Sequence, residues 1–470
     1  MADNTYHPGH NSEEKIDPPA YNTIPQDASV PVEQQQAEEG STGPGLPDDV
    51  FGPEEGHDIK YKTLSWPLVA VLMITEIVSN GVLSLPSSLA AVGVVPGVVA
   101  IFFLGAFATY TSWALVQFKL RHPEVHNMGD VGMILFGPIG REILGGGTIL
   151  FAVCATGSQI LAGQLALSVL SASKLCALAF AGIFSAAITI TSFPRTLNNL
   201  GWLSVVGGIS IIVAGIVAMA GAGALPVDPG NVSIAVTTEF TSAFVSITNP
   251  VFAYAGHYIF FILISEMKRP QDAMKAAWTL QIVATTFYIA FAVVTYWYVG
   301  PGVSSPSLLS LSPLWSKISF GLAIPNFFIG GSLYSHTAAK IVFVRVFRRS
   351  RHIHSHTLTG WGVWTVLILV VNAAAFVFAV GIPSFNYLVG ITASLFAAWY
   401  TYGLAGVFWL HDTYHFEGGS RALFERPFMF TVNILTVLAG GFICVGGLYA
   451  TIVALRMSAK AGELQTPFQC

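Results

Sequence analysis

Five side chains that can hold or pass a proton or a cation stand inside long apolar stretches of the sequence. Glu76 lies in the first stretch and His257 in the sixth, while Ser332, His336 and Lys340 recur at i, i+4 and i+8 in the eighth. That spacing places the last three along one face of a helix. Ionisable groups inside a membrane are costly and usually mark an ion pathway. The alternatives are a hydrogen-bonded structural acid at Glu76 and a Lys340 whose long stem reaches the interface.

Two short segments interrupt the helices that would carry these groups. "EIVSNGVLSLPSS" (76–88) contains a Ser-Asn-Gly triplet followed by Pro86, and "NPVFAYAGHYIFF" (249–261) contains Pro250 and a run of small residues. In a bilayer every backbone N–H and C=O needs a partner, so irregular backbone is found only where it faces protein or a polar cavity. The matched pair predicts a binding site between two broken helices. The alternative is two ordinary kinks that helix packing tolerates.

The composition is that of a polytopic membrane protein. Only 10% of the 470 residues are charged, 53% are hydrophobic and the mean hydropathy is +0.64, whereas a soluble chain carries about 25% charged residues. The acidic residues gather in the N-terminal tail and the basic ones in short loops, so nucleic acid is not an expected partner. Phosphate-loop, nucleophile-elbow and zinc-hydrolase motifs are absent from the sequence, so we expect neither an enzyme, nor an ATP-driven pump, nor a cofactor.

Three regions follow one another along the chain. Residues 1–60 are predicted to be a disordered cytoplasmic tail because few of them could form a core, residues 61–457 a transmembrane domain, and residues 458–470 a short extracellular tail. The transmembrane region contains eleven apolar stretches long enough to cross about 30 Å of hydrocarbon. They are 66–91, 96–118, 143–170, 175–194, 201–221, 241–266, 274–299, 317–344, 361–381, 386–410 and 428–454.

The distribution of basic residues predicts a cytoplasmic N-terminus and an extracellular C-terminus. With that orientation sixteen of the 21 lysines and arginines fall on the cytoplasmic side and four outside, with Lys340 inside a span, as the positive-inside tendency requires. The sequon Asn231-Val232-Ser233 then falls outside, which makes Asn231 a candidate glycosylation site. The four cysteines suggest no disulfide framework.

Several motifs resemble one family of membrane proteins. They are "GVLSLPSSLA" in the first stretch, "FGPIGR" (136–141), "FAYAGH" in the sixth stretch and "EMKRP" (266–270). Together they resemble the amino acid/auxin permease family, and most closely its fungal neutral amino acid permeases, over about residues 61–455. The resemblance implies an all-α fold of eleven transmembrane helices with a 5+5 inverted repeat of the LeuT/APC-like, broken-helix kind, and secondary active amino acid transport. Ser79 departs from the family's frequent Gly-x-Gly at the first break.

Within that fold, the two breaks are expected to bind a neutral amino acid. The predicted substrate-binding residues are Ser79, Asn80, Gly81, Val82, Leu83, Phe252, Ala253, Tyr254 and Gly256. The N–H groups of 81–83, at the start of a half-helix, would receive the carboxylate, and the carbonyls of 252–254 would hold the ammonium. Neither break offers a partner for a charged side chain, so an apolar or aromatic substrate is favoured. Core packing is the alternative role for Phe252 and Tyr254.

The predicted mechanism is proton-coupled import at the plasma membrane. A proton relay would run through Glu76 and the basic groups of the eighth span. A charged Lys340 would occupy the place where this fold class binds sodium. We therefore expect the coupling ion to be H⁺ rather than Na⁺. Two alternatives stay open: an amino acid sensor that uses the same pocket, and an exporter in the vacuolar membrane. Counterflow of labelled amino acid separates a transporter from a sensor.

Three further motifs are weaker. "PPAY", with Pro18, Pro19 and Tyr21, matches the PPxY ligand of WW domains and would recruit a ubiquitin ligase, although a Pro-rich tail produces such tetrapeptides by chance. "RVFRRSRHIHSH" (345–356) is interpreted as a loop attracted to anionic membrane lipid rather than a metal tract. His411, Asp412, His415 and Glu417 are interpreted as a polar connector, and no metal site is predicted.

Overall fold

The computed structural model describes residues 50–51, 59–348, 350–382, 384–462 and 468. The WW-ligand motif at Pro18, Pro19 and Tyr21 and most of the predicted N-terminal tail lie outside these residues. Within the described part of the chain, nearly all regular structure is helical, and one isolated parallel bridge joins Leu64 to Met267.

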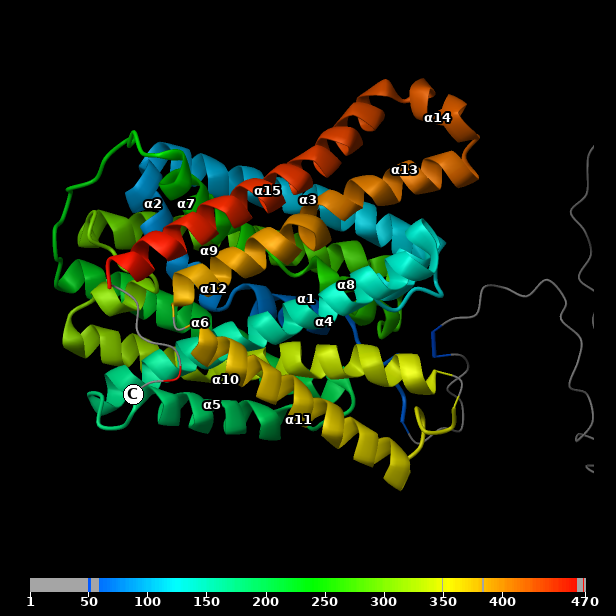
Figure 1. The fold of residues 1–470 in the computed structure, drawn as a ribbon, viewed down its shortest axis with the longest axis horizontal. Coiled ribbons are helices and arrows are strands. Elements are labelled where there is room, and N and C mark those ends of the chain that lie inside the picture. Colours follow the sequence, from blue (N-terminus) through cyan, green and yellow to red (C-terminus); the bar gives the residue numbers. More distant parts are fainter. Residues whose placement is uncertain (1–49, 52–58, 349, 383, 463–467, 469–470) are drawn as a thin grey trace, which may run out of the picture. The chain divides into compact units, whose positions relative to one another are not determined.

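Fifteen α-helices follow one another along the described residues (Figure 1). They are α1 Trp66–Ile77, α2 Leu85–Val92, α3 Val94–Arg121, α4 Met128–Ser171, α5 Ala177–Thr191, α6 Leu197–Ala224, α7 Phe240–Ala253, α8 His257–Ser265, α9 Ala273–Val299, α10 Pro313–Phe347, α11 Leu358–Gly381, α12 Phe385–Thr392, α13 Leu404–Phe416, α14 Gly419–Glu425 and α15 Pro427–Lys460. A 3₁₀ turn, Asn80–Ser84, separates α1 from α2, and a π-helix, Ala393–Gly403, joins α12 to α13.

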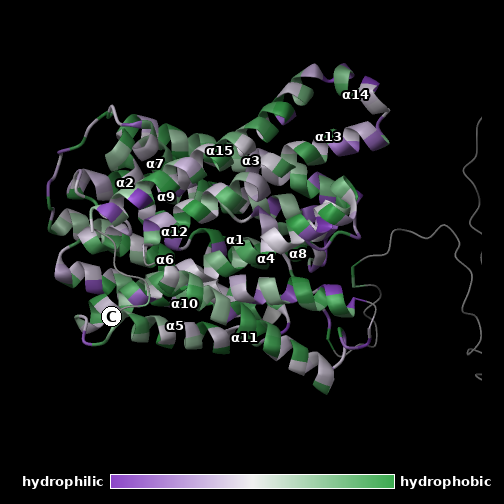
Figure 2. Cartoon of the chain, in the orientation of Figure 1, coloured by the Kyte–Doolittle hydropathy of each residue, from purple (hydrophilic) through white to green (hydrophobic). Residues whose placement is uncertain are grey.

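The eleven predicted apolar segments are accounted for by these helices. Ten segments of the described chain are long and apolar enough to cross a membrane, with α1–α2, α7–α8 and α12–α13 counted as one each. The shorter apolar helix α5 is the eleventh. Figure 2 shows hydrophobic residues along the lengths of the helices and many of the hydrophilic residues near their ends, as expected for helices surrounded by hydrocarbon.

The third span is longer than predicted and is kinked. The sequence indicated 143–170, but α4 begins at Met128, where the Asn127 side chain accepts a hydrogen bond from the Gly129 N–H at 2.8 Å. This cap starts a short helix, which changes direction at Gly137, a residue with a φ of 70°. A positive φ favours glycine, and Pro138 then begins the long part of α4.

Both predicted helix breaks are confirmed. The first span leaves helical geometry at Val78 and Ser79, turns through Asn80–Ser84 and restarts as α2 with a proline in its first turn. The sixth span ends α7 at Ala253 and restarts as α8 at His257. The π-helical stretch in the tenth span was not predicted, because nothing in "ASLFAAWYTYG" breaks a helix.

The two broken spans form the centre of the helical bundle. In their most apolar windows, 94% of the residues of α7–α8 and 83% of those of α1–α2 are buried, against 17% in α15. A membrane helix that is buried on all sides contacts other helices instead of lipid. The breaks therefore lie inside the protein, where irregular backbone can find partners.

The structure contains a disulfide bond that the sequence did not indicate. Cys176, which precedes α5, is disulfide-bonded, whereas Cys154 and Cys444 are free. The sequence carried no sign of this bond, because cysteine spacing alone does not determine which cysteines pair. In the loop between α6 and α7, Asn231 is exposed, and its side-chain amide donates to Asp228 at 2.6 Å.

Candidate substrate and coupling site

The two breaks lie against each other. A Cβ added at Gly81 would stand 3.0 Å from the Ala253 Cα, and one added at Gly256 would collide with the Ile77 side chain. A side chain at Gly81 would crowd the backbone of the second break, and one at Gly256 would displace the Ile77 side chain, so the close approach favours glycine at both positions. The predicted binding residues of the two breaks are thus brought together at one place.

Tyr288 of α9 joins the ends of the two first half-helices. Its hydroxyl lies 2.8 Å from the Ile77 carbonyl, at the end of α1, and 2.6 Å from the Ala253 carbonyl, at the end of α7. Because a hydroxyl has one proton, it can donate to only one of these carbonyls at a time. Tyr288 therefore satisfies part of the backbone freed by each break. The sequence did not single it out, since an aromatic residue in an apolar span is usually a packing residue.

The carbonyls predicted to hold an ammonium differ in their partners. The Phe252 carbonyl accepts from the Ala255 N–H at 2.9 Å, and the Ala253 carbonyl accepts from Tyr288. For the Tyr254 carbonyl, no hydrogen bond is found among the described residues. In the first break, the Val82 N–H makes a long bond of 3.3 Å to the Ser79 carbonyl. Of the three carbonyls, that of Tyr254 therefore has the most lone-pair capacity left within the described chain, although the residue is fully buried.

The polar side chains of the first break attach it to neighbouring helices. Ser79 donates to the Asn326 side chain of α10 at 2.5 Å and accepts from Gln159 of α4 at 2.9 Å. Asn80 donates to Ser158 of α4 at 2.9 Å. Ser79 and Asn80 therefore fix the break to α4 and α10 through their side chains. Sequence reasoning missed Gln159 and Asn326, although polar amides inside apolar spans were a visible signal.

Glu76 is buried beside two tyrosines. Its side chain accepts a hydrogen bond of 2.6 Å from the Tyr258 hydroxyl, and its backbone carbonyl accepts one of 3.0 Å from Tyr334. Only 1% of Glu76 is exposed, and no basic side chain of the described residues forms an ion pair with it. An isolated buried carboxyl group is costly to ionise, so its chemistry depends on these neutral neighbours.

Lys340 forms a buried ion pair with Glu266, at the end of α8. Both residues are at most 1% exposed, and the ammonium also lies 4.7 Å from the centre of the Tyr61 ring. The Leu64 N–H donates to the Glu266 carbonyl at 3.0 Å, so the segment before α1 packs against the same place. Lys340 does not reach the surface, and the snorkelling alternative is wrong.

The side chains of His257, Ser332 and His336, which were also predicted to take part in coupling, contact other helices and not Glu76. The His257 Nε2 lies 2.9 Å from the Ala108 carbonyl and 2.8 Å from the Ser112 hydroxyl, both on α3. Ser332 contacts Thr191, and the His336 Nε2 lies 3.4 Å from the Arg195 carbonyl, both near the connection of α5 to α6. No hydrogen bond of the described residues links these three side chains to the Glu76 carboxyl group, so the relay predicted from sequence is not continuous.

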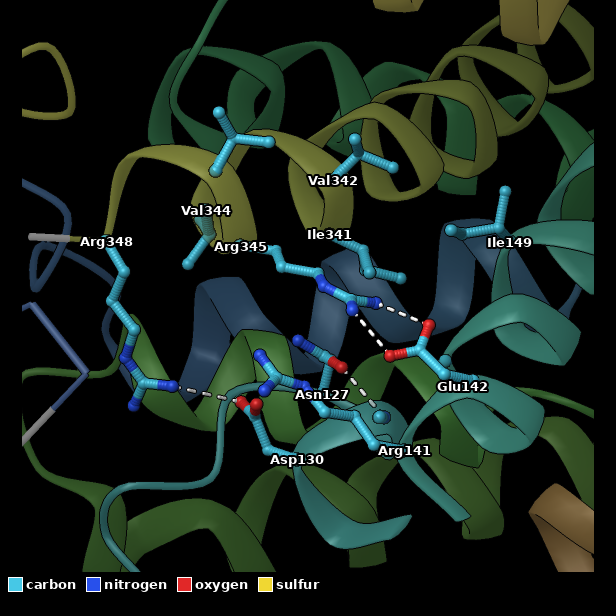
Figure 3. Close-up of a pocket in the computed structure, with 13 residues that line it drawn as sticks. Asn127, Asp130, Arg141, Glu142, Ile149, Ile341, Val342, Val344, Arg345 and Arg348 are labelled. Carbon is cyan, nitrogen blue, oxygen red and sulfur yellow. Dashed lines mark hydrogen bonds and ion pairs between the residues drawn. The ribbon is translucent and has the colours of Figure 1, made fainter. Parts of the chain in front are cut away.

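A separate charged pocket lies between the start of α4 and the end of α10 (Figure 3). It has a volume of about 510 Å³. Arg345 donates to both oxygens of Glu142, at 3.0 and 2.5 Å, and Arg348 lies 3.4 Å from an Asp130 oxygen. These ion pairs connect α4 to α10. The pocket contains no residue of either break, and it is therefore distinct from the candidate site.

Three side chains between α3 and α13 come close enough to hold a metal ion. The ligand atoms of His122, His411 and Asp412 lie within 4.8 Å of one another. However, His122 faces two carboxylates, with Nε2 3.1 Å from Asp412 and Nδ1 3.3 Å from Glu124. Burial lowers the pKa of His122, but the hydrogen bonds and charges of the two carboxylates outweigh it and raise the pKa above its usual value. The cluster is better described as a network of polar contacts between His122 and carboxylates that favour its protonated form.

The fold and site together define a class of protein. A helical bundle with two broken spans, whose loose backbone groups meet at its centre, is the arrangement of secondary transporters. The profile of the family described as "Transmembrane amino acid transporter protein" matches residues 62–453. The chain belongs to this family, as the motifs had suggested, and it is a transporter rather than an enzyme.

Known proteins agree with this assignment. A transmembrane transporter of Fusarium pseudograminearum is 29% identical over 91% of each chain, and an N amino acid transport system protein of Neurospora crassa is 29% identical over 91% of this chain and 92% of its own. Among solved structures, a Na⁺-coupled sialic acid symporter in a substrate-bound, outward-open state has a TM-score of 0.54 at 11% identity and covers 88% of this chain and 94% of its own. This likeness shows a LeuT-like fold.

Proposed function

We propose that this amino acid transporter imports neutral amino acids together with protons by alternating access. The observation that carries the proposal is the meeting of the two breaks at Gly81 and Ala253, where Gly81 lies five residues along the chain from the buried acid Glu76. The substrate carboxylate would lie at the N–H groups of 81–83. The ammonium would lie at the carbonyls of the second break, chiefly Tyr254.

The absence of a charged partner supports a neutral substrate side chain. Apart from Glu76 and His257, the described side chains at the breaks and those that bond to them are Ser, Asn, Gln, Tyr and apolar residues. A charged substrate side chain would lose its hydration without an opposite charge in return. The name of the Neurospora crassa relative, an N amino acid transport system protein, supports an amino acid substrate.

Glu76 is the proposed proton carrier. It is buried, its side-chain partner is neutral, and it adjoins the break through its own helix. A group of this kind can take up a proton when substrate binds and release it on the other side. Lys340 is paired with Glu266, which favours a role in holding the cytoplasmic end closed.

Two observations support the orientation with an extracellular loop between α6 and α7. Asn231 is exposed and can accept a glycan. Cys176, on the same side in this topology, is disulfide-bonded, and such bonds persist outside the cytosol. The plasma membrane fits both observations. The lumenal face of a vacuolar membrane fits them too, which makes export the competing direction.

Purified protein in liposomes tests the coupling ion. An inward pH gradient should drive accumulation of a labelled neutral amino acid, and a sodium gradient of equal size should not. Competition by the common amino acids then ranks the substrates. Uptake that follows sodium and ignores the pH gradient would overturn proton coupling, and binding without counterflow would indicate a sensor instead.

A further inference from the structure

An apolar groove opens between α3 and α9, away from the substrate breaks. It has a volume of about 590 Å³. Phe102 on α3 and Trp278 and Ile282 on α9 line it, and each is more than half exposed. Large apolar side chains on the outside of a membrane-spanning bundle face lipid, so the groove is open to the bilayer rather than to water.

One polar group inside the groove has no partner. Gln281 lines it and is 3% exposed, and neither its amide nitrogen nor its amide oxygen forms a hydrogen bond within the described chain. A buried amide without a partner is unfavourable. Water, the usual remedy, is scarce at a surface that faces hydrocarbon. A membrane component that carries a hydroxyl could donate to the amide oxygen and accept from its N–H.

The lining also restricts what that component can be. None of the twelve residues around the groove is charged, so a phosphate or ammonium headgroup would be buried without an opposite charge. Its aromatic walls, among them Trp113 and Trp278, offer flat surfaces. A rigid, flat body loses less conformational freedom on binding than a flexible acyl chain.

The expected depth of Gln281 in the membrane also fits a rigid, uncharged ligand with a hydroxyl group. Tryptophans concentrate at the membrane interface, and Gln281 lies three residues beyond Trp278, or about 4.5 Å along the helix. A hydroxyl bound there would lie just below the headgroups, with the rest of the ligand extending toward the bilayer centre. We propose that the groove between α3 and α9 is a sterol-binding site, in which the sterol hydroxyl pairs with the Gln281 amide.

The groove adjoins the sixth-span break at Tyr254. Thr285 lines the groove and accepts a hydrogen bond of 3.0 Å from Tyr254, a residue of that break. Gly105 lines the groove as well, and a Cβ there would stand 2.8 Å from the Tyr254 hydroxyl. A bound sterol would thus lie against the helices that hold the break.

Photolabelling of the full chain in phospholipid nanodiscs tests this proposal. A photoreactive sterol should label peptides within 102–113 and 274–286, and unlabelled sterol should compete. Gln281→Leu, which keeps the volume but removes the amide, should reduce labelling about fivefold, as expected for one lost hydrogen bond. Labelling that is unchanged in Gln281→Leu, or that is spread evenly over the lipid-facing helices, would overturn the site.

Two tryptophans of α9 supply a matched pair of variants. Trp278 lines the groove, and Trp297 does not, although the two are 53% and 50% exposed. Trp278→Ala should lose labelling and Trp297→Ala should keep it, with both variants eluting as the same species as the wild type. Equal losses in both would contradict the proposal, as would a photoreactive fatty acid that labels the groove as strongly as the sterol.

Discussion

Glu76 and Glu266 are the most deeply buried carboxylic acids of the described chain, and they have different partners. Glu76 adjoins the first break and accepts a hydrogen bond from a neutral hydroxyl, that of Tyr258. Glu266 ends α8 and is paired with the Lys340 ammonium. Both acids are at most 1% exposed, so burial alone does not distinguish them. Their partners do.

The difference in partners suits the two acids to different roles, one in stabilising the fold and the other in carrying a proton. A buried acid that is paired with a cation stays ionised, because removing either charge leaves the other unpaired. A buried acid with a neutral partner can exist with or without its proton, and its protonation can follow substrate binding. The paired acid is therefore suited to holding helices together, and the unpaired acid to carrying a proton.

The ion pair should give the largest effect on stability. Lys340→Met leaves Glu266 buried without its cation, and the free energy of unfolding should fall by about 3 to 5 kcal/mol. Thermal unfolding of the purified protein measures the change. Adding Glu266→Gln to this variant should restore most of the stability, since no charge is then left unpaired. If the double variant is no more stable than Lys340→Met, the two residues do not act as a pair.

Substitutions of the two tyrosines beside Glu76 test whether its hydrogen-bond partner controls its protonation. Tyr258→Phe removes the donor to its carboxyl group, a bond worth about 1.5 to 3 kcal/mol when the acceptor is charged. The pH at which uptake is half-maximal should shift in this variant. Tyr334→Phe is the matched control, because Tyr334 bonds to the Glu76 backbone carbonyl. Equal shifts in both variants would mean that the Tyr258 hydroxyl has no special role.

Tyr288 should have a smaller effect, on substrate affinity. Tyr288→Phe keeps the ring but removes the hydroxyl between the Ile77 and Ala253 carbonyls. We expect the free energy of substrate binding to weaken by about 1 kcal/mol, the usual worth of one hydrogen bond. The concentration for half-maximal uptake should rise several-fold, with thermal stability nearly unchanged. An unaltered concentration would show that the two half-helix ends are held by other contacts.

The smallest effect is expected at His122, a charged group outside the core. Its raised pKa means that protonation stabilises the fold. This contribution is complete below the ordinary histidine pKa of about 6.5 and is lost as the pH rises through the raised value. His122→Gln should therefore lower the thermal midpoint by a few degrees in acid and leave it unchanged in alkaline buffer. A difference that is the same at every pH would contradict stabilisation of the fold by protonation of His122.

Much of the architecture was accessible from sequence because membrane helices follow simple rules. Length and hydropathy predicted the spans, and small polar residues, glycines and prolines at 79–86 and 250–256 predicted the two breaks. The start of α4 was missed because its first helix, capped by Asn127, precedes the apolar run. The π-helix of the tenth span left no signal, since its residues also suit an α-helix.

The partners of the site residues were less predictable, because they come from distant helices. Lys340 and Glu266 were both visible, yet only the packing of α10 against the end of α8 shows that they pair. Regular spacing put Ser332, His336 and Lys340 on one face, but that face meets different neighbours along its length. Sequence spacing gives positions on one helix, and it does not identify the helix opposite.

Substrate-driven proton movement tests the central claim most directly. Liposomes that contain a pH-sensitive dye would receive a neutral amino acid outside, with no other gradient imposed. Wild-type protein and the Lys340→Met/Glu266→Gln variant should acidify the interior. Glu76→Gln should not, although it should still exchange labelled amino acid across the membrane. Acidification by Glu76→Gln at the wild-type rate would contradict the account.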